Sequence, residues 1–150
     1  MQSTVGKLGK VIVAKFEHGE DFIAGLGDLS KKHKIKAGVV LFLGALKGGR
    51  IVTGPKMPVV PPEPNWFEFD DGREVFGVGT IFREGNTPKL HLHTGMGKGD
   101  QAIVGCVREK AKIFLVIEAI IIELRGIKAD KAVDPQTGLM MLRILSGGPG

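Results

Sequence analysis

The apolar stretch GVVLFLGAL, residues 38–46, decides the fold class of this chain. Apolar side chains occupy odd and even positions alike, so a strand here would bury both of its faces. The stretch is short for a helix, and glycines bound it, which favours a buried strand. A strand that is apolar on both faces needs cover on both faces.

Further strands lie on both sides of this stretch, and one helix precedes it. The helix is predicted over Glu20–His33, because acidic residues occupy its start and lysines its end, as the helix dipole favours. The predicted strands are Lys10–Glu17, Gly38–Leu46, Arg50–Thr53, Arg73–Phe82, Lys89–Thr94, Gln101–Val107, Lys112–Leu124 and Gly138–Leu145.

The connections are predicted from glycine and proline. Gly48 and Gly49 should form one turn and Gly95–Asp100 another, while Gly54–Pro64 holds five prolines and should be a surface loop. We therefore expect an α+β fold, with a mostly antiparallel β-sheet and one main helix packed on it. The single domain is predicted over residues 8–146, with a flexible tail at 147–150. One helix covers one face, so the other face indicates self-association.

Composition excludes several classes of protein. The 150 residues are 43% apolar and 25% charged, which is typical of a globular domain rather than a disordered chain. One cysteine excludes an intrachain disulfide. The longest apolar run, Ile113–Leu124, contains two glutamates and is shorter than the roughly 18 residues of a membrane helix. With no apolar segment at the N-terminus, we expect a cytoplasmic protein.

His91 and His93 carry the clearest chemical signal. They lie two positions apart on a predicted strand, so their imidazoles project from the same face, while Leu92 turns to the core. Two imidazoles so placed can share one zinc ion. Two ordinary polar residues on a wet strand face would give the same pattern.

Cys106 is a third candidate ligand. It lies on the strand that should return beside the histidines, and its thiolate joins the two imidazoles if it pairs opposite His91. A slip of one residue would turn it to the other face, and a lone buried cysteine is most often a small hydrophobic residue. The set His91, His93 and Cys106 resembles a zinc ligand set with an open fourth position.

Glu74 and Glu118 interrupt apolar strands. A carboxylate in such a place needs a partner or an exit to water. Each is a candidate to support the metal, to act as an acid or base, or to contact another subunit. A solvated strand face explains each of them equally well.

Several motifs, in their order and spacing, resemble one family. FEHGED at 16–21 opening a helix, the stretch at 38–46, EVFGVGT at 74–80 and LHLH at 90–93 resemble the PPC domain of plants and prokaryotes. Glu118 falls near the later strand glutamate of that family. The resemblance extends over about residues 11–145.

The resemblance implies an α/β fold that assembles as a homotrimer. Prokaryotic members are single-domain and often described as DNA-binding, whereas plant members add AT-hooks with Arg-Gly-Arg cores, which this chain lacks. Where the family often has Gly-Gly-His, this chain has Val104-Gly105-Cys106. Cysteine in place of histidine keeps a metal ligand and shifts the preference toward zinc.

Three functions remain open from the sequence. The first is a cytoplasmic homotrimer with zinc at His91, His93 and Cys106, which binds a small-molecule or protein ligand. The second is a zinc-dependent hydrolase, with a metal-bound water as nucleophile and Glu118 or Glu74 as general base. The third is a non-specific DNA-binding protein; its formal charge of +5 comes from scattered lysines and predicts weak binding.

Overall fold

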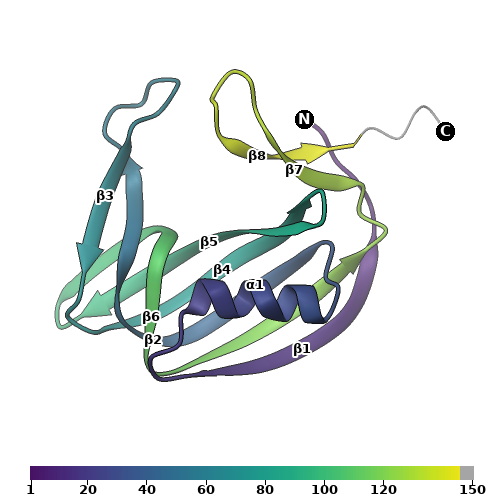
Figure 1. The fold of residues 1–150 in the computed structure, drawn as a ribbon. Coiled ribbons are helices and arrows are strands. Elements are labelled where there is room, and N and C mark those ends of the chain that lie inside the picture. The colour runs from purple at the N-terminus through teal and green to yellow at the C-terminus, as the bar shows by residue number, and fades with distance from the viewer. Residues whose placement is uncertain (146–150) are drawn as a thin grey trace.

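The computed structural model describes residues 1–145, so the predicted tail lies outside the described residues. One helix and eight strands follow one another along this part of the chain (Figure 1). The elements are β1 (Lys7–Glu17), α1 (Phe22–Lys32), β2 (Gly38–Pro55), β3 (Pro64–Phe69), β4 (Arg73–Glu84), β5 (Thr87–Lys98), β6 (Gln101–Arg125), β7 (Ala129–Val133) and β8 (Met140–Ile144).

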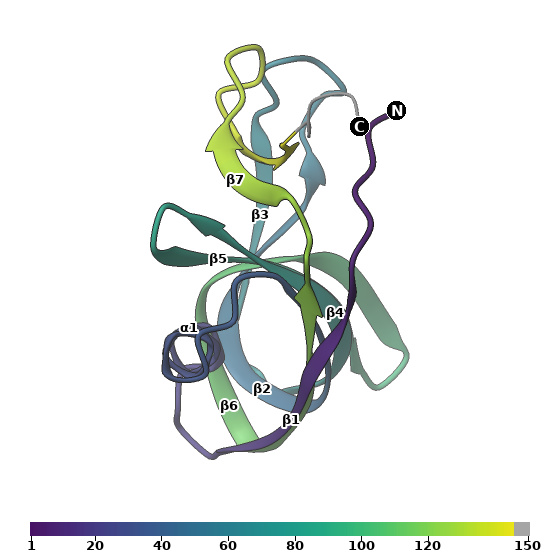
Figure 2. The same cartoon turned by 90° about the vertical axis from the view of Figure 1, so that its right-hand side faces the viewer.

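Six strands form one antiparallel sheet in the order β1-β6-β5-β4-β2-β3. Strand β6 also pairs with β2, so β2, β4, β5 and β6 form a closed ring of hydrogen-bonded strands, which Figure 2 shows end-on. Strands β7 and β8 form a separate two-stranded sheet. The predicted α+β domain with a mostly antiparallel sheet is therefore confirmed.

The helix α1 packs on one side of the sheet (Figure 1) and is short, with 11 residues. It begins after Asp21, whose carboxylate accepts a hydrogen bond from the amide of Ala24 at 3.0 Å and so caps the helix. Phe22 and Leu26 are fully buried, and the Phe22 ring lies 4.9 Å from that of Phe42 on β2. The helix thus covers one face of the sheet.

Two glycines of β4 let the sheet close tightly around this core. A Cβ atom at Gly79 would lie 2.2 Å from Leu92 Cδ2, and one at Gly77 would lie 2.3 Å from Phe42 Cζ. Both contacts are far below van der Waals distance, so larger residues at these positions would force the strands apart.

The turn predicted at Gly48 and Gly49 is absent, and the turn predicted over Gly95–Asp100 is shorter than expected. Strand β2 continues through Gly48 and Gly49, and its register against β6 shifts there instead of reversing. A Cβ atom at either glycine would lie 3.1 Å from a backbone oxygen, so these glycines permit close approach of strands. Strand β5 likewise continues to Lys98, and only Gly99 and Asp100 form the turn. The two strands predicted over residues 101–124 are one strand, β6.

Two strands were not predicted. Strand β3 follows the proline-rich loop and lies at the edge of the sheet, where its first residue, Pro64, is tolerated. Strand β7 is only five residues long and pairs with β8. The β2–β3 loop and the β7–β8 hairpin rise on the same side of the ring, above it in Figures 1 and 2, and residues of both line one cavity.

Candidate metal centre

His91 and His93 lie on β5 and project from the outer face of the sheet. Leu92 between them is buried in the core, as the strand alternation predicted. The His91 and His93 Nε2 atoms lie 3.1 Å apart. Two nitrogens bound to one tetrahedral zinc at 2.0–2.1 Å would be separated by about 3.3 Å, so this pair is already near the required spacing.

Cys106 lies on β6, directly opposite His93. The register thus differs by two residues from the pairing opposite His91 considered from the sequence. A slip of two keeps a side chain on the same face, so the thiol still joins the imidazoles. Possible ligand atoms of His91, His93 and Cys106 all lie within 4.8 Å of one another, and Cys106 is only 4% exposed.

Burial shifts the pKa values of His91 and Cys106 in opposite directions. Partial burial lowers the pKa of His91, and the positive charges of Lys131 and Arg108 lower it further. The imidazole is therefore neutral at pH 7 and free to bind a metal. Burial raises the pKa of the Cys106 thiol, an effect that Arg108 and Lys131 partly offset. The thiol keeps its proton until a metal displaces it.

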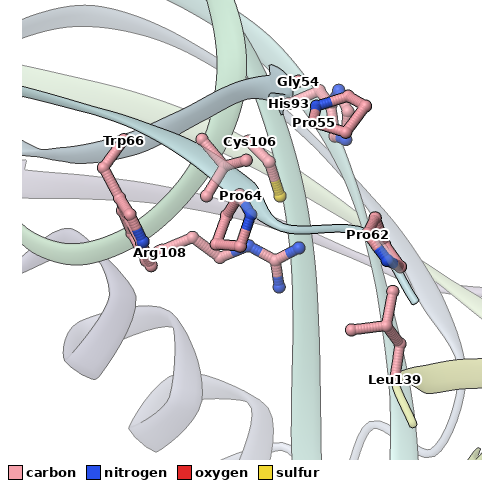
Figure 3. A pocket seen from close by; sticks show the side chains of 10 residues that line it. Gly54, Pro55, Pro62, Pro64, Trp66, His93, Cys106, Arg108 and Leu139 are labelled. Atoms are coloured by element: carbon pink, nitrogen blue, oxygen red, sulfur yellow. The ribbon is translucent and has the colours of Figure 1, made fainter. Parts of the chain in front are cut away.

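A cavity of about 520 Å³ lies beside His93 and Cys106 (Figure 3). One wall is formed by rigid apolar side chains from β2, β3 and the loop between them. Arg108, two residues after Cys106 on β6, also lines it. The lining residues are Val52, Gly54, Pro55, Pro62, Pro64, Trp66, His93, Cys106, Arg108 and Leu139.

A second cavity, of about 590 Å³, reaches the same centre from the side of His91. It shares Arg108 and Leu139 with the first, and Lys131 of β7 lines it as well. Lys131 is 7% exposed, and burial lowers its pKa. Arg108 lies two residues after Cys106 and so shares its strand face, a signal present in the sequence. Lys131 gives no such signal, because β7 itself was not predicted.

Glu74 and Glu118 lie outside both cavities. In the strand register, Glu118 lies opposite Lys15 of β1 and Leu43 of β2. Glu74 lies opposite Ala45 of β2. Both side chains are exposed. Within the described chain, therefore, neither carboxylate lies at the centre formed by the histidines and the cysteine.

Solved structures with this fold come from archaea and bacteria. A PPC protein from Pyrococcus horikoshii has a TM-score of 0.83 at 21% identity, covering 97% of this chain and 99% of its own. A metal-containing protein from Archaeoglobus fulgidus has a TM-score of 0.82 at 21% identity, covering 94% and 98%. A candidate DNA-binding protein from Bacteroides thetaiotaomicron has a TM-score of 0.73 at 18% identity, covering 94% and 99%.

Two further observations complete the comparison. No curated protein sequence matches the chain. No helix within residues 1–145 has the length and hydropathy to cross a membrane.

The sequence profile of one family matches residues 3–125, which is most of the chain. The order of motifs at 16–21, 38–46, 74–80 and 90–93 had indicated the same family. The chain belongs to the Plants and Prokaryotes Conserved (PCC) domain family, the PPC family that its motifs resemble.

Proposed function

We propose that this protein is a cytoplasmic homotrimer that holds one zinc ion per chain at His91, His93 and Cys106 and binds a ligand beside it. The observation that carries the proposal is the convergence of candidate ligand atoms of His91, His93 and Cys106 within 4.8 Å, where His93 and Cys106 line one cavity and His91 lines a second. The metal-containing relative from Archaeoglobus fulgidus, which has the same fold, supports a metal in this family.

Zinc is the metal that these donors fit best. Two neutral imidazoles and one thiolate match the ligands of zinc sites that keep a fourth position open. When bound, the ion would supply a Lewis acid held by His91, His93 and Cys106. The single cysteine cannot form an intrachain disulfide, which fits a reducing compartment such as the cytoplasm.

The trimer is supported by the outer face of the sheet. Val13, Ile120, Leu41 and Val78 are cross-strand neighbours on β1, β6, β2 and β4, and all are exposed in the single chain. Phe76, on the same face, is 72% exposed. Contiguous apolar surface of this kind marks a protein interface. The number of three subunits comes from the resemblance to the family.

Ligand binding accounts for the site better than hydrolysis. A zinc hydrolase needs a general base near the metal-bound water. The two carboxylates considered for that role, Glu74 and Glu118, line neither cavity.

Non-specific DNA binding is the second candidate. Two relatives with this fold, from Ralstonia eutropha and Bacteroides thetaiotaomicron, are candidate DNA-binding proteins. The formal charge of +5 permits weak phosphate contacts. Binding to unrelated DNA sequences should be equal, and it should disappear by about 200 mM salt. Sequence-selective binding that survives this salt concentration would contradict the weak, non-specific interpretation.

X-ray absorption at the zinc edge tests the proposed centre. Untagged protein loaded with zinc should show two nitrogen scatterers at about 2.0–2.1 Å and one sulfur scatterer at about 2.3 Å. The Cys106→Ala variant should lose the sulfur scatterer and keep the nitrogens. A wild-type spectrum without sulfur would remove Cys106 from the ligand set, and a protein that takes up no zinc would end the proposal.

A further inference from the structure

The two cavities beside the metal centre differ in chemistry. The cavity beside His93 and Cys106 is bounded mainly by prolines, Trp66 and Leu139. The cavity beside His91 contains the positive side chains of Lys89, Arg108 and Lys131. Arg108 and Leu139 line both, so one ligand beside the metal centre can contact an apolar wall and a positive wall together.

The positive wall has no carboxylate to balance it. Neither lining contains an aspartate or a glutamate among the described residues. Lys89 pairs with Glu84 at 2.9 Å, and its charge is therefore already compensated. Arg108 and Lys131 form no ion pair with any residue in 1–145.

Of these two cations without an ion pair, Lys131 gives the stronger indication of an anionic ligand. Its side chain is more than nine-tenths buried, and within the described part of the chain it donates no hydrogen bond. Lysine is rarely this buried unless it is paired, and the Lys131 ammonium is not sealed from solvent but reaches the cavity beside His91. Arg108 and Lys131 line the same cavity, so the two cations face one region. Burial lowers the pKa of Lys131, and repulsion from Arg108 lowers it further.

The apolar wall fits a compact hydrocarbon group. Trp66 is held in place by Arg50, whose guanidinium lies 4.2 Å from the centre of its ring. Pro55, Pro62 and Pro64 add rigid surface to the lining of the same cavity (Figure 3). A cavity of about 520 Å³ is within the range of small-molecule sites.

We infer that this site binds a small organic carboxylate with a compact apolar body, whose carboxylate lies between Arg108 and Lys131 beside the metal centre and whose body lies against Trp66 and the prolines. The inference rests on the proposed function, because it names the ligand class of the same site. Arginine and lysine supply charge-assisted hydrogen bonds to the carboxylate, and a zinc ion adds a further positive charge.

The single tryptophan makes the test direct. The chain has one Trp and no Tyr, so fluorescence excited at long wavelength reports on Trp66 alone. We would titrate the intact, zinc-loaded protein with cyclohexanecarboxylate, and in parallel with the neutral cyclohexanecarboxamide of the same shape. Saturable binding of the acid, with at least tenfold weaker binding of the amide, is expected. Equal binding of the two, or no binding of the acid, would overturn the inference.

Three variants assign the effect to the two cations. Lys131→Met and Arg108→Met should each weaken binding of the acid at least tenfold, and neither should weaken zinc binding. Lys128→Met removes the same charge from an exposed residue outside both linings and should change nothing. Arg108 is exposed, so its variant keeps the test valid if Lys131→Met fails to fold. Unchanged binding of the acid in Arg108→Met would contradict the assignment.

Zinc content separates this inference from the proposed function. Zinc is measured in each sample, and the titration is repeated after its removal by a chelator. Protein that holds zinc but binds no acid refutes the carboxylate inference alone. Protein that takes up no zinc refutes the metal centre, and binding of the acid that still depends on Arg108 and Lys131 would then sustain the inference.

Discussion

The inner and outer faces of the same strands have nearly the same composition and opposite environments. On β2, Val40 and Phe42 face inward and are almost fully buried, whereas their neighbours Leu41 and Leu43 are 45% and 57% exposed. Helix α1 covers the inner face only. Hydrophobic periodicity therefore cannot tell which face is the core of the single chain, and the apolar outer face indicates a partner.

The outer face changes at β5 from apolar side chains to the candidate metal ligands. The row that begins with Leu41 on β2 continues through Val78 on β4 to His93 on β5 and Cys106 on β6. The candidate chemistry thus occupies the end of a row that is otherwise apolar. Residues of the β2–β3 loop and the β7–β8 hairpin line the cavities beside this end of the row.

The largest effect is expected on the inner face. Gly79→Val would place side-chain atoms where Leu92 Cδ2 lies 2.2 Å and the His91 backbone oxygen 2.9 Å from the new Cβ. Overpacking typically costs 1–3 kcal/mol, and here a backbone contact is added, so we expect a loss at or above about 3 kcal/mol. Urea unfolding measures it. Gly97→Ala is the control, because its nearest neighbour is 3.8 Å away, and an equal loss there would contradict the argument.

On the outer face, the effect should fall on assembly rather than on folding. Leu41→Glu and Phe76→Glu place charges within the proposed interface, where an unpaired charge is strongly unfavourable. Light scattering should show a trimer for the wild type and a monomer for either variant. Val59→Glu, on the exposed proline-rich loop, should remain a trimer. A wild-type monomer at micromolar concentration would refute the interface.

The pH dependence of the metal-free protein should reveal two of the candidate ligands, His91 and Cys106. Burial lowers the pKa of His91 below its ordinary 6.5, so only the unfolded state binds this proton as pH falls through that value, and stability decreases. Burial raises the pKa of Cys106 above its ordinary 9.0, so only the unfolded state releases this proton as pH rises through 9, and stability decreases again.

Thermal unfolding between pH 5 and 10 tests both limits. His91→Ala should flatten the acidic decrease, and Cys106→Ala should flatten the alkaline one. Zinc should remove the alkaline decrease in the wild type, because a bound thiol is already deprotonated. Profiles that neither variant changes would show that other groups control the pH dependence.

The smallest effect concerns two glycines of α1. Gly27→Ala places a methyl group in open space, and should stabilise the protein by about 0.5–1 kcal/mol. Gly25→Ala should not, because its Cβ would lie 2.8 Å from the buried Phe16 ring. Chemical unfolding of the two variants compares them under identical conditions. Equal stabilisation by both would contradict the described packing of β1 against α1.

Short-range sequence patterns predicted the features that depend on neighbouring residues, namely strand faces and the start of the helix. Strand alternation placed His91 and His93 on one face with Leu92 in the core, and the acidic start of the helix placed its cap near Asp21. Glycine was misread at Gly48, because close approach between strands and a chain reversal both require the same small residue.

The sequence did not predict which segments that are distant in the chain lie side by side at the site. The register that sets Cys106 opposite His93 depends on a turn of two residues rather than six. Lys131 reaches the site from β7, which is far along the chain and too short to show a pattern. Neither the register of Cys106 nor the position of Lys131 can be read from the sequence around His91, His93 and Cys106.

Zinc stoichiometry is the most direct test of the central claim, that His91, His93 and Cys106 form one metal centre. Untagged protein, reconstituted with zinc and dialysed, should retain about one zinc per chain by elemental analysis. His91→Ala, His93→Ala and Cys106→Ala should each retain much less, whereas His33→Ala, at the far end of α1, should match the wild type. A wild type without zinc, or variants that all retain it, would contradict the account.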